Sequence, residues 1–371
     1  MMLTLGTDIM TNPSEKPFRS IICMLVLSLL SQLFAFGQSA VQNLKFTNIS
    51  IKDGLSQSSP NCIFQDNRGL IWIGTEDGLN KYDGYSFTVY KPRLNDPNSI
   101  SNSRILSIAE DHSGNLWIGT NGGGLNKYAR KEDKFYNLMA GDDSLAGNII
   151  YSVLPFGAHE LWIGSDKGLE LLNIETGIYS NVENEYTALQ SLTGIPIYAL
   201  LSDDQILWIG TAKGLYSFNT LDKSLQHYEN LSENQPKKDE AITALLIDKH
   251  QNVIIGSQSG LSLLDQGTGN ITHIRLPNHN NIEGNSVKAL LEDREGNIWI
   301  ATFGNGLFVG SVEAGLFENY LYDHLNPYSI RNNEVLSPFI DFSGLIWIGT
   351  NGIDIYNPLK EKFVLYDYVP Y

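Results

Sequence analysis

Short apolar runs separated by polar turns fill most of the chain, and one such pattern returns at a regular distance. Its clearest copy, residues 111–128, reads DHSGNLWIGTNGGGLNKY. Aligned on the tryptophan, successive copies are 45 to 48 residues apart. The seven copies are centred on Trp72, Trp117, Trp162, Trp208, Ile254, Trp299 and Trp347. A repeat of this length falls in the range of propeller blades.

Each copy predicts four short strands joined by tight turns. In the first copy these are residues 61–65, 70–75, 79–82 and 87–90, with Asp and Gly in the gaps between them. The second strand, LIWIGT, has no polar alternation, so both faces of its sheet need burial. Sheets packed face to face around an axis meet that need. The pattern therefore predicts an all-β fold, a seven-bladed β-propeller of four-stranded antiparallel blades within residues 44–371.

Three positions of the repeat are predicted to build the blade. The Trp residues are expected to wedge between adjacent blades, and the Gly two residues later to let the neighbouring blade approach. An Asp-x-x-Gly segment suits the turn between the first two strands. The segment is intact at Asp66, Asp111, Asp293 and Asp341. It is degraded in the three middle copies, where we expect the turn to be rebuilt.

One predicted strand is left over. Residues 44–49 (LKFTNI) look like a fourth strand but precede the first copy, while residues 362–366 (KFVLY) supply the seventh copy with its own. Either residues 44–49 join the seventh blade and close the ring, or they belong to a blade outside this chain.

The first 38 residues are predicted to be a signal peptide. Lys16 and Arg19 precede an apolar run over residues 21–36, and the small residues that follow place cleavage near Gly37. The alternative is an uncleaved anchor, but the run is shorter than the roughly 20 residues that a membrane-spanning helix needs. The mature protein is therefore expected to be exported, soluble and periplasmic.

Charge and composition exclude several classes of function. The formal net charge of −16 would repel a phosphate backbone, so nucleic acid is not an expected partner. The glycine-rich residues 121–124 and 304–306 lie between two strands, which indicates hairpin turns and not phosphate loops. The seven His show no spacing that suits a metal, and Cys62 is alone outside the leader. We therefore expect no metal, no cofactor and no intramolecular disulfide.

Binding capacity is predicted on one face of the ring, which we call the upper face. We take the first strand of each blade to run away from this face. The upper face then carries the turns between second and third strands and the long, polar connections between blades, which are the loops most suited to binding a ligand. The candidate ligand-binding residues are Arg93, Asn102, Arg104, Asn121, Asn148, Tyr151, Tyr198, Phe303, Asn305, Asn332 and Asn333. The alternative is that the Asn and Ser residues before each first strand only cap the upper rim.

The quoted segments resemble a known family. Residues 52–90, with GLSQ, D-x-x-G-x-x-W-I-G-T and G-L-N-K-Y-D, and residues 111–128 are similar to two-component regulator propeller repeats. The resemblance implies the exported sensor region of hybrid two-component system histidine kinases, found mostly in Bacteroidetes, which sense glycan breakdown products. Typical members carry two propellers, a β-sandwich domain, a membrane helix, a kinase core, receiver domains and a DNA-binding domain.

This chain departs from that plan because it stops after one propeller and matches no phosphoacceptor histidine box or ATP-binding glycine lid. We therefore expect no kinase and no signalling output in this polypeptide, and membrane attachment only through a missing downstream region. In a longer protein, residues 44–49 could complete a blade encoded further on.

The functional hypothesis is a periplasmic sensing propeller that binds an oligosaccharide on its upper face, with a signalling protein as its other partner. The alternative is a free-standing scaffold for protein–protein interaction. A glycosidase or lyase is a third interpretation, but such enzymes need paired carboxylates or a His/Glu constellation near the axis. The predicted central strands are mainly apolar or small, so we expect no enzymatic activity. The identity of the ligand and the formation of a homodimer stay open.

Overall fold

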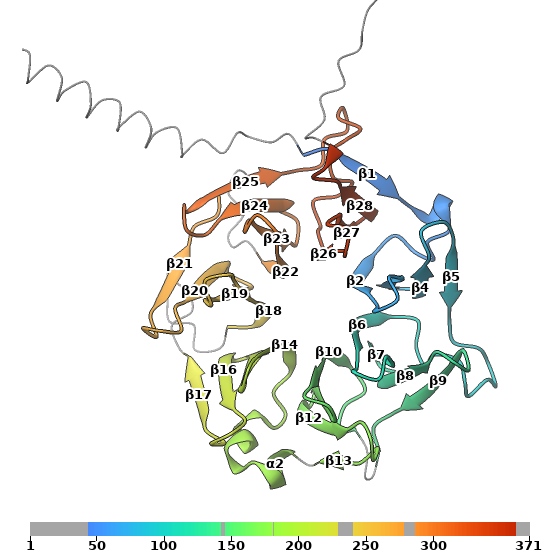
Figure 1. Ribbon diagram of the computed structural model, residues 1–371, viewed down its shortest axis with the longest axis vertical. Coiled ribbons are helices and arrows are strands. Elements are labelled where there is room, and N and C mark those ends of the chain that lie inside the picture. The colour runs from blue at the N-terminus through green and yellow to red at the C-terminus, as the bar shows by residue number, and fades with distance from the viewer. Residues whose placement is uncertain (1–43, 142–144, 181, 229–239, 278–285, 361–371) are drawn as a thin grey trace, which may run out of the picture. The chain divides into compact units, whose positions relative to one another are not determined.

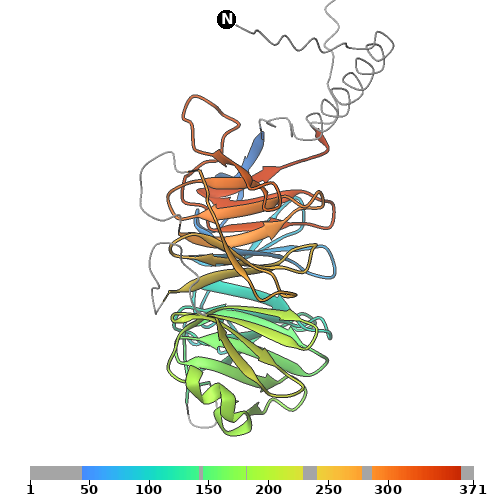
Figure 2. The ribbon, with the colours of Figure 1, turned by 90° about the vertical axis from the view of Figure 1, so that its left-hand side faces the viewer.

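Seven four-stranded antiparallel sheets stand around a central axis (Figure 1). The structure is a computed structural model that describes residues 44–141, 145–180, 182–228, 240–277 and 286–360. The first strands of neighbouring sheets contact one another in a closed circle. Seen edge on, the strands of each sheet cross between the two faces of the ring (Figure 2). The predicted seven-bladed β-propeller is confirmed.

Each blade has an inner strand at the axis, two middle strands and an outer strand. The inner strands are β2 (Pro60–Gln65), β6 (Ile105–Glu110), β10 (Ile150–Phe156), β14 (Ile197–Asp203), β18 (Ile242–Ile247), β22 (Val287–Glu292) and β26 (Ser337–Ile340). The second strands are β3 (Ile71–Thr75), β7 (Leu116–Thr120), β11 (Glu160–Ser165), β15 (Ile206–Thr211), β19 (Val253–Ser257), β23 (Ile298–Thr302) and β27 (Ile346–Thr350). The third strands are β4 (Gly78–Tyr82), β8 (Leu125–Ala129), β12 (Gly168–Asn173), β16 (Gly214–Asn219), β20 (Leu261–Leu264), β24 (Leu307–Ser311) and β28 (Gly352–Tyr356). The outer strands are β5 (Phe87–Tyr90), β9 (Lys134–Leu138), β13 (Tyr179–Ser180), β17 (Leu225–Tyr228), β21 (Ile271–Ile274), β25 (Leu316–Tyr320) and β1 (Phe46–Ile49).

Short helices occupy some of the connections. They are η1 (Ile51–Asp53), α2 (Val182–Glu185) and η2 (Thr187–Leu192). The connection between the third and fourth blades was predicted to be a polar loop, but its helices bury Val182, Leu189 and Leu192 in a cluster that includes Trp162. This connection is therefore part of the packed core, which the sequence interpretation missed.

An apolar cluster fills each junction between blades. Trp72 of the first blade packs with Ile105 and Ile118 of the second. At the other end of the ring, Trp347 of the seventh blade packs with Ile73 of the first. Because the same contact forms between neighbours and across the closure, every blade has both of its faces covered.

The glycine two residues after each wedge position allows this close packing. A Cβ atom added to Gly74 would lie 2.6 Å from Ile105 Cγ2, and one added to Gly256 would lie 2.5 Å from Val287 Cγ1. Both neighbours belong to the next blade, and both distances are too short for carbon atoms in contact. A larger residue at these two positions would therefore push the blades apart.

The aspartate of the Asp-x-x-Gly turn also holds the wedge tryptophan. Asp111 Oδ1 accepts hydrogen bonds of 2.9 Å from the backbone N–H groups of Ser113 and Asn115. Asp111 Oδ2 accepts the indole Nε1–H of Trp117 at 2.9 Å. The same indole bond joins Trp72 to Asp66, Trp299 to Asp293 and Trp347 to Asp341. One carboxylate thus ties the turn to the interface between blades.

The three blades with a degraded turn differ among themselves. In the third blade no aspartate stands at the turn position that holds the indole elsewhere, and in the fourth the indole nitrogen of Trp208 finds no hydrogen-bond partner in the part of the chain that the structure describes. In the fifth, Asp248 keeps both turn bonds, and Gln251 takes the left-handed conformation, with φ of 64°, that glycine supplies elsewhere. The expectation that all three turns are rebuilt is therefore wrong for the fifth blade.

The outer strand of the seventh blade comes from the start of the propeller. β1 pairs antiparallel with β28, with Phe46 opposite Tyr356 and Ile49 opposite Ile353. The N-terminal strand therefore closes the ring, and its assignment to a blade outside this chain is wrong. Residues 362–366 and the predicted signal peptide, residues 1–38, lie outside the described residues.

The turn carboxylate is predicted to stabilise the blade interface. Asp111→Ala would leave two turn N–H groups and the buried Trp117 indole without their acceptor. We expect the free energy of unfolding, measured by urea denaturation, to fall by roughly 2–3 kcal/mol. The control is His112→Ala, at an exposed position of the same turn, with an expected change within about 0.5 kcal/mol. Equal effects of the two changes would contradict this role for Asp111.

The ring closure is predicted to depend on the buried face of β1. Phe46 is only 3% exposed and packs in the cluster that holds Trp299, so Phe46→Ala should destabilise the protein by roughly 3–5 kcal/mol. Thr47→Ala is the control, because Thr47 is exposed on the opposite face of the strand. Urea midpoints of both variants test the closure, and a midpoint for Phe46→Ala as high as that of the control would contradict it.

Candidate functional site

One side chain from each blade is turned toward the axis of the ring by an irregularity of the inner strand. In six blades the pairing between the first two strands skips one residue, the second of the inner strand. The skipped residues are Asn61, Leu106, Tyr151, Tyr198, Thr243 and Lys288. Leu336 takes the same place before β26 in the seventh blade. Such β-bulges redirect side chains without ending the strand, and here they form a ring, which we call the bulge ring.

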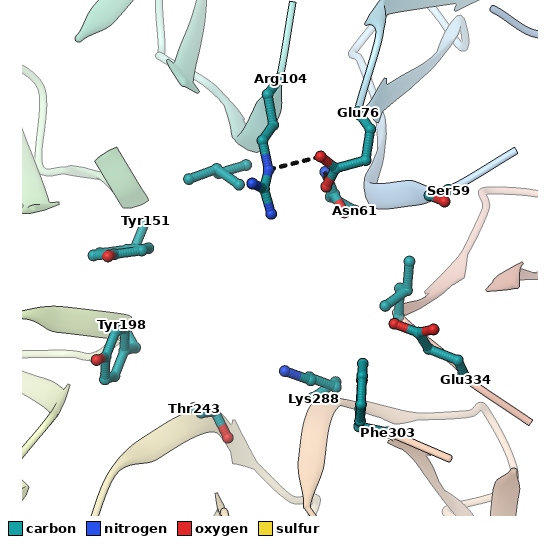
Figure 3. Close-up of a pocket in the computed structure, with 12 residues that line it drawn as sticks. Ser59, Asn61, Glu76, Arg104, Tyr151, Tyr198, Thr243, Lys288, Phe303 and Glu334 are labelled. Carbon is teal, nitrogen blue, oxygen red and sulfur yellow. Dashed lines mark hydrogen bonds and ion pairs between the residues drawn. The ribbon is translucent and has the colours of Figure 1, made fainter. Parts of the chain in front are cut away.

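The bulge ring surrounds a cavity of about 520 Å³ on the upper face of the propeller (Figure 3). All seven of its residues line the cavity, together with residues from the connections and from the turns between second and third strands. The additional lining residues are Ser59, Glu76, Arg104, Phe303 and Glu334. A cavity of this volume is large enough for a small-molecule ligand.

A charged, hydrogen-bonded wall belongs to the first and second blades. Arg104 Nε lies 2.8 Å from Glu76 Oε2, and Asn61 Nδ2 donates to Glu76 Oε1 at 3.0 Å. With its amide oxygen toward Arg104, Asn121 accepts from Nη1 of that residue at 2.9 Å. These contacts hold the guanidinium group in one orientation, so this wall offers fixed polar groups to a ligand.

An aromatic wall belongs to the third and fourth blades. The rings of Tyr151 and Tyr198 meet edge to face, with centroids 5.0 Å apart and an interplanar angle of 70°. Partial burial raises the pKa of the Tyr151 phenol above its ordinary value, so this hydroxyl remains protonated at physiological pH. The pair offers an apolar ring surface and a hydroxyl donor side by side.

The remaining wall combines a cation, a ring and a carboxylate. Lys288 Nζ lies 5.0 Å from the ring centroid of Phe303, which is 55% exposed. Thr243 Oγ1 donates to the carbonyl oxygen of Val287 at 2.6 Å, which ties the fifth blade to the sixth. Glu334 completes this side of the cavity, from the connection that leads into the seventh blade.

Four of the predicted ligand-binding residues lie together in the cavity, and most of the others form hydrogen bonds within the connections between blades. Arg104, Tyr151, Tyr198 and Phe303 line the cavity, and Asn121 supports Arg104. Four further Asn side chains accept backbone N–H groups of their own connections, as rim caps do: Asn102 from Arg104, Asn148 from Ala140, Asn332 from Glu334 and Asn333 from Tyr322. These four therefore have a structural role at the upper rim.

Two candidates lie elsewhere. Asn305 is 5% exposed, in the turn before β24. Arg93 lines a separate pocket of about 310 Å³ beside β5 and β9, and its Nη1 lies 3.7 Å from Asp96 Oδ2. Neither residue lines the axial cavity.

Sequence reasoning missed most of the bulge ring, although the aligned copies contain a signal for it. The position before each bulge is apolar, as in Ile105 and Ile150, and the position after it is small, as in Ser107 and Ser152. Between them the bulge position changes from Asn through Leu, Tyr and Thr to Lys. A position that varies between two constant ones in a repeat indicates a side chain released from packing.

Within the described residues, no group of His, Cys, Asp and Glu side chains could hold a metal ion. Among the helices described, none is long and apolar enough to cross a membrane. The side chains that line the cavity offer aromatic rings, hydroxyl groups, an amide and four charged groups, those of Glu76, Arg104, Lys288 and Glu334.

Solved structures with a similar fold include a domain of a two-component system and an enzyme. An extracellular domain assigned to the hybrid two-component system BT3049 of B. thetaiotaomicron has a TM-score of 0.72 and 26% identity, over 85% of this chain and 42% of its own. The chain thus spans less than half of that relative. Virginiamycin B lyase of Staphylococcus aureus has a TM-score of 0.61 over 85% of this chain and 98% of its own, but at 14% identity it shows a shared fold alone.

Sequence comparison reaches the same group of proteins. A segment of 59 residues is 49% identical to Histidine kinase P4 of Formosa agariphila, and covers 16% of this chain and 4% of that kinase. Residues 54–77, 99–122 and 281–304 match the family model described as Two component regulator propeller. The chain therefore carries two-component regulator propeller repeats, and the resemblance inferred from its first two repeats is confirmed.

Proposed function

We propose that this propeller is the periplasmic ligand-sensing part of a hybrid two-component system and that it binds an oligosaccharide in the axial cavity. The observation that carries the proposal is the bulge ring, where seven side chains of five residue types face one cavity on an otherwise repetitive frame. The similarity to an extracellular domain of a two-component system supports sensing as the role of the fold. Export by the predicted signal peptide, residues 1–38, is part of the same proposal.

The walls of the cavity suit a saccharide. Sugar rings present an apolar face of C–H groups, which can pack on the Tyr151 and Tyr198 rings, and a periphery of hydroxyl groups. Glu76 and Arg104 offer an acceptor and a donor to those hydroxyls from the neighbouring wall of the cavity (Figure 3). A few fixed polar groups around an aromatic surface are what a specific small-molecule site requires.

The signalling output is proposed to reside outside the described propeller. Such an output could lie in another part of a longer protein or in a separate signalling protein. Ligand binding would then act by changing how the propeller contacts that output region, because a ligand shifts an equilibrium only through a difference in affinity between two states.

A protein-binding scaffold is the second candidate, and one specific observation favours it. Leu94 is 94% exposed and Leu325 is 80% exposed, each in a connection on the upper face. In both connections a serine hydroxyl, Ser99 or Ser329, accepts a backbone N–H from the start of the loop, at 3.0 and 3.1 Å. Two ordered loops that expose leucine are suited to a protein partner.

Calorimetric titration with a panel of oligosaccharides distinguishes the two functions. For any saccharide that binds, we expect Tyr151→Ala and Tyr198→Ala each to weaken affinity at least about tenfold, because each removes part of the ring surface. Tyr136→Ala is the matched control, since Tyr136 lies on the outer strand β9 and is 47% exposed. Its affinity should be unchanged.

The opposite results have separate meanings. A folded protein that binds no saccharide in the panel, but loses a protein partner when Leu94 and Leu325 are changed to Ser, would favour the scaffold. A saccharide whose affinity is insensitive to both cavity tyrosines would contradict the axial cavity as the binding site.

A further inference from the structure

The bulge ring contains a cation that no described carboxylate neutralises. Lys288 occupies the bulge of β22, and its side chain points toward the middle of the cavity (Figure 3). Its Nζ lies 5.0 Å from the ring centroid of Phe303, and within the described residues it forms no ion pair. Arg104, the other cation of the cavity, is held by Glu76.

The environment of Lys288 sets a condition on any ligand that fills the cavity. The Phe303 ring orients the ammonium group through its quadrupole but supplies no counter-charge. A neutral ligand that covered Lys288 would remove water from an unpaired charge, which is unfavourable unless new hydrogen bonds replace the water. A ligand with an anionic group would replace the lost hydration with an ion pair. The cavity therefore favours an anionic group at this one position, against the formal net charge of −16 that the chain carries as a whole.

We propose that the ligand is an acidic saccharide, whose carboxylate or sulfate group pairs with Lys288 while a sugar ring packs on Tyr151 and Tyr198. This inference rests on the proposed sensing function and adds the chemical class of the saccharide. The three residues come from adjacent parts of the bulge ring, in the third, fourth and sixth blades, with only Thr243 of the fifth blade between them. One oligosaccharide can therefore reach all of them.

Glu334 restricts where the anionic group can lie. This carboxylate lines the cavity on the far side of Phe303 from Lys288 (Figure 3), and it forms no ion pair with Lys288. A ligand anion near Glu334 would be repelled, whereas one on the tyrosine side of Lys288 would lie away from it. The two charges together therefore orient an acidic saccharide in one direction.

The test compares acidic oligosaccharides with their neutral derivatives by calorimetric titration of the purified protein. An oligogalacturonate is paired with its methyl ester, and a sulfated galactan oligosaccharide, which contains no uronic acid, with its desulfated form, so that the two arms distinguish carboxylate from sulfate. For at least one pair we expect the acidic member to bind at least about tenfold more tightly, and its affinity to fall with added salt.

Variants then assign the preference to Lys288. Lys288→Met should remove the difference between acidic and neutral members, Lys288→Arg should retain most of it, and Glu334→Gln should strengthen binding of the acidic member. Lys288 is exposed to the cavity, so the Met variant is expected to keep the thermal stability of the wild type.

The results that would contradict the acidic ligand class differ from those that would contradict the sensing function. If neutral members bind as tightly as acidic ones, and Tyr151→Ala weakens both, the acidic class is overturned while the sensing function stands. The same holds if Lys288→Met leaves an acidic preference intact. If the folded protein binds no member of either pair and no other saccharide, the proposed function fails together with this inference.

Discussion

The packing of a tryptophan from one blade against the inner strands of the next is the contact on which the structure depends. A single blade has two apolar faces and cannot bury them alone, so each sheet is stable only between two others. Gly74 and its equivalents let the sheets approach, and Asp111 and its equivalents fix the tryptophan from the turn below. Such a chain of contacts has to close, and β1 completes the seventh blade beside the first. The result is a stiff ring in which the position of each inner strand is set by its neighbours.

A stiff ring holds the side chains of the bulge ring in fixed positions around the cavity. On the inner strands, the residues on either side of the bulge are committed to packing, as Ile150 and Ser152 are around Tyr151. The bulge leaves one side chain per blade out of the packing between blades and directs it to the axis. A change at such a position alters the cavity without disturbing the frame. The fold thus separates the residues that maintain the ring from those that define its ligand.

The repeat made most of the fold predictable, because the contacts that form a blade are local in sequence. The strands predicted at residues 61–65 and 87–90 agree closely with β2 and β5. Pairing between the ends of the propeller is not local, so the place of residues 44–49 stayed ambiguous until β1 was found beside β28. In the site, Asn333 was predicted to bind the ligand but caps its own connection, whereas Lys288 was not among the predicted residues. A bulge depends on the register between two strands, which a periodic pattern does not reveal.

Hydrogen exchange with and without a bound oligosaccharide tests the central claim most directly, namely that the sensed ligand lies in the axial cavity. The account predicts slower exchange in peptides that contain the starts of the inner strands, around Tyr151, Tyr198 and Lys288, with little change in outer strands such as β9 and β17. Protection confined to the rim connections around Leu94 and Leu325, or to the outer strands, would contradict it.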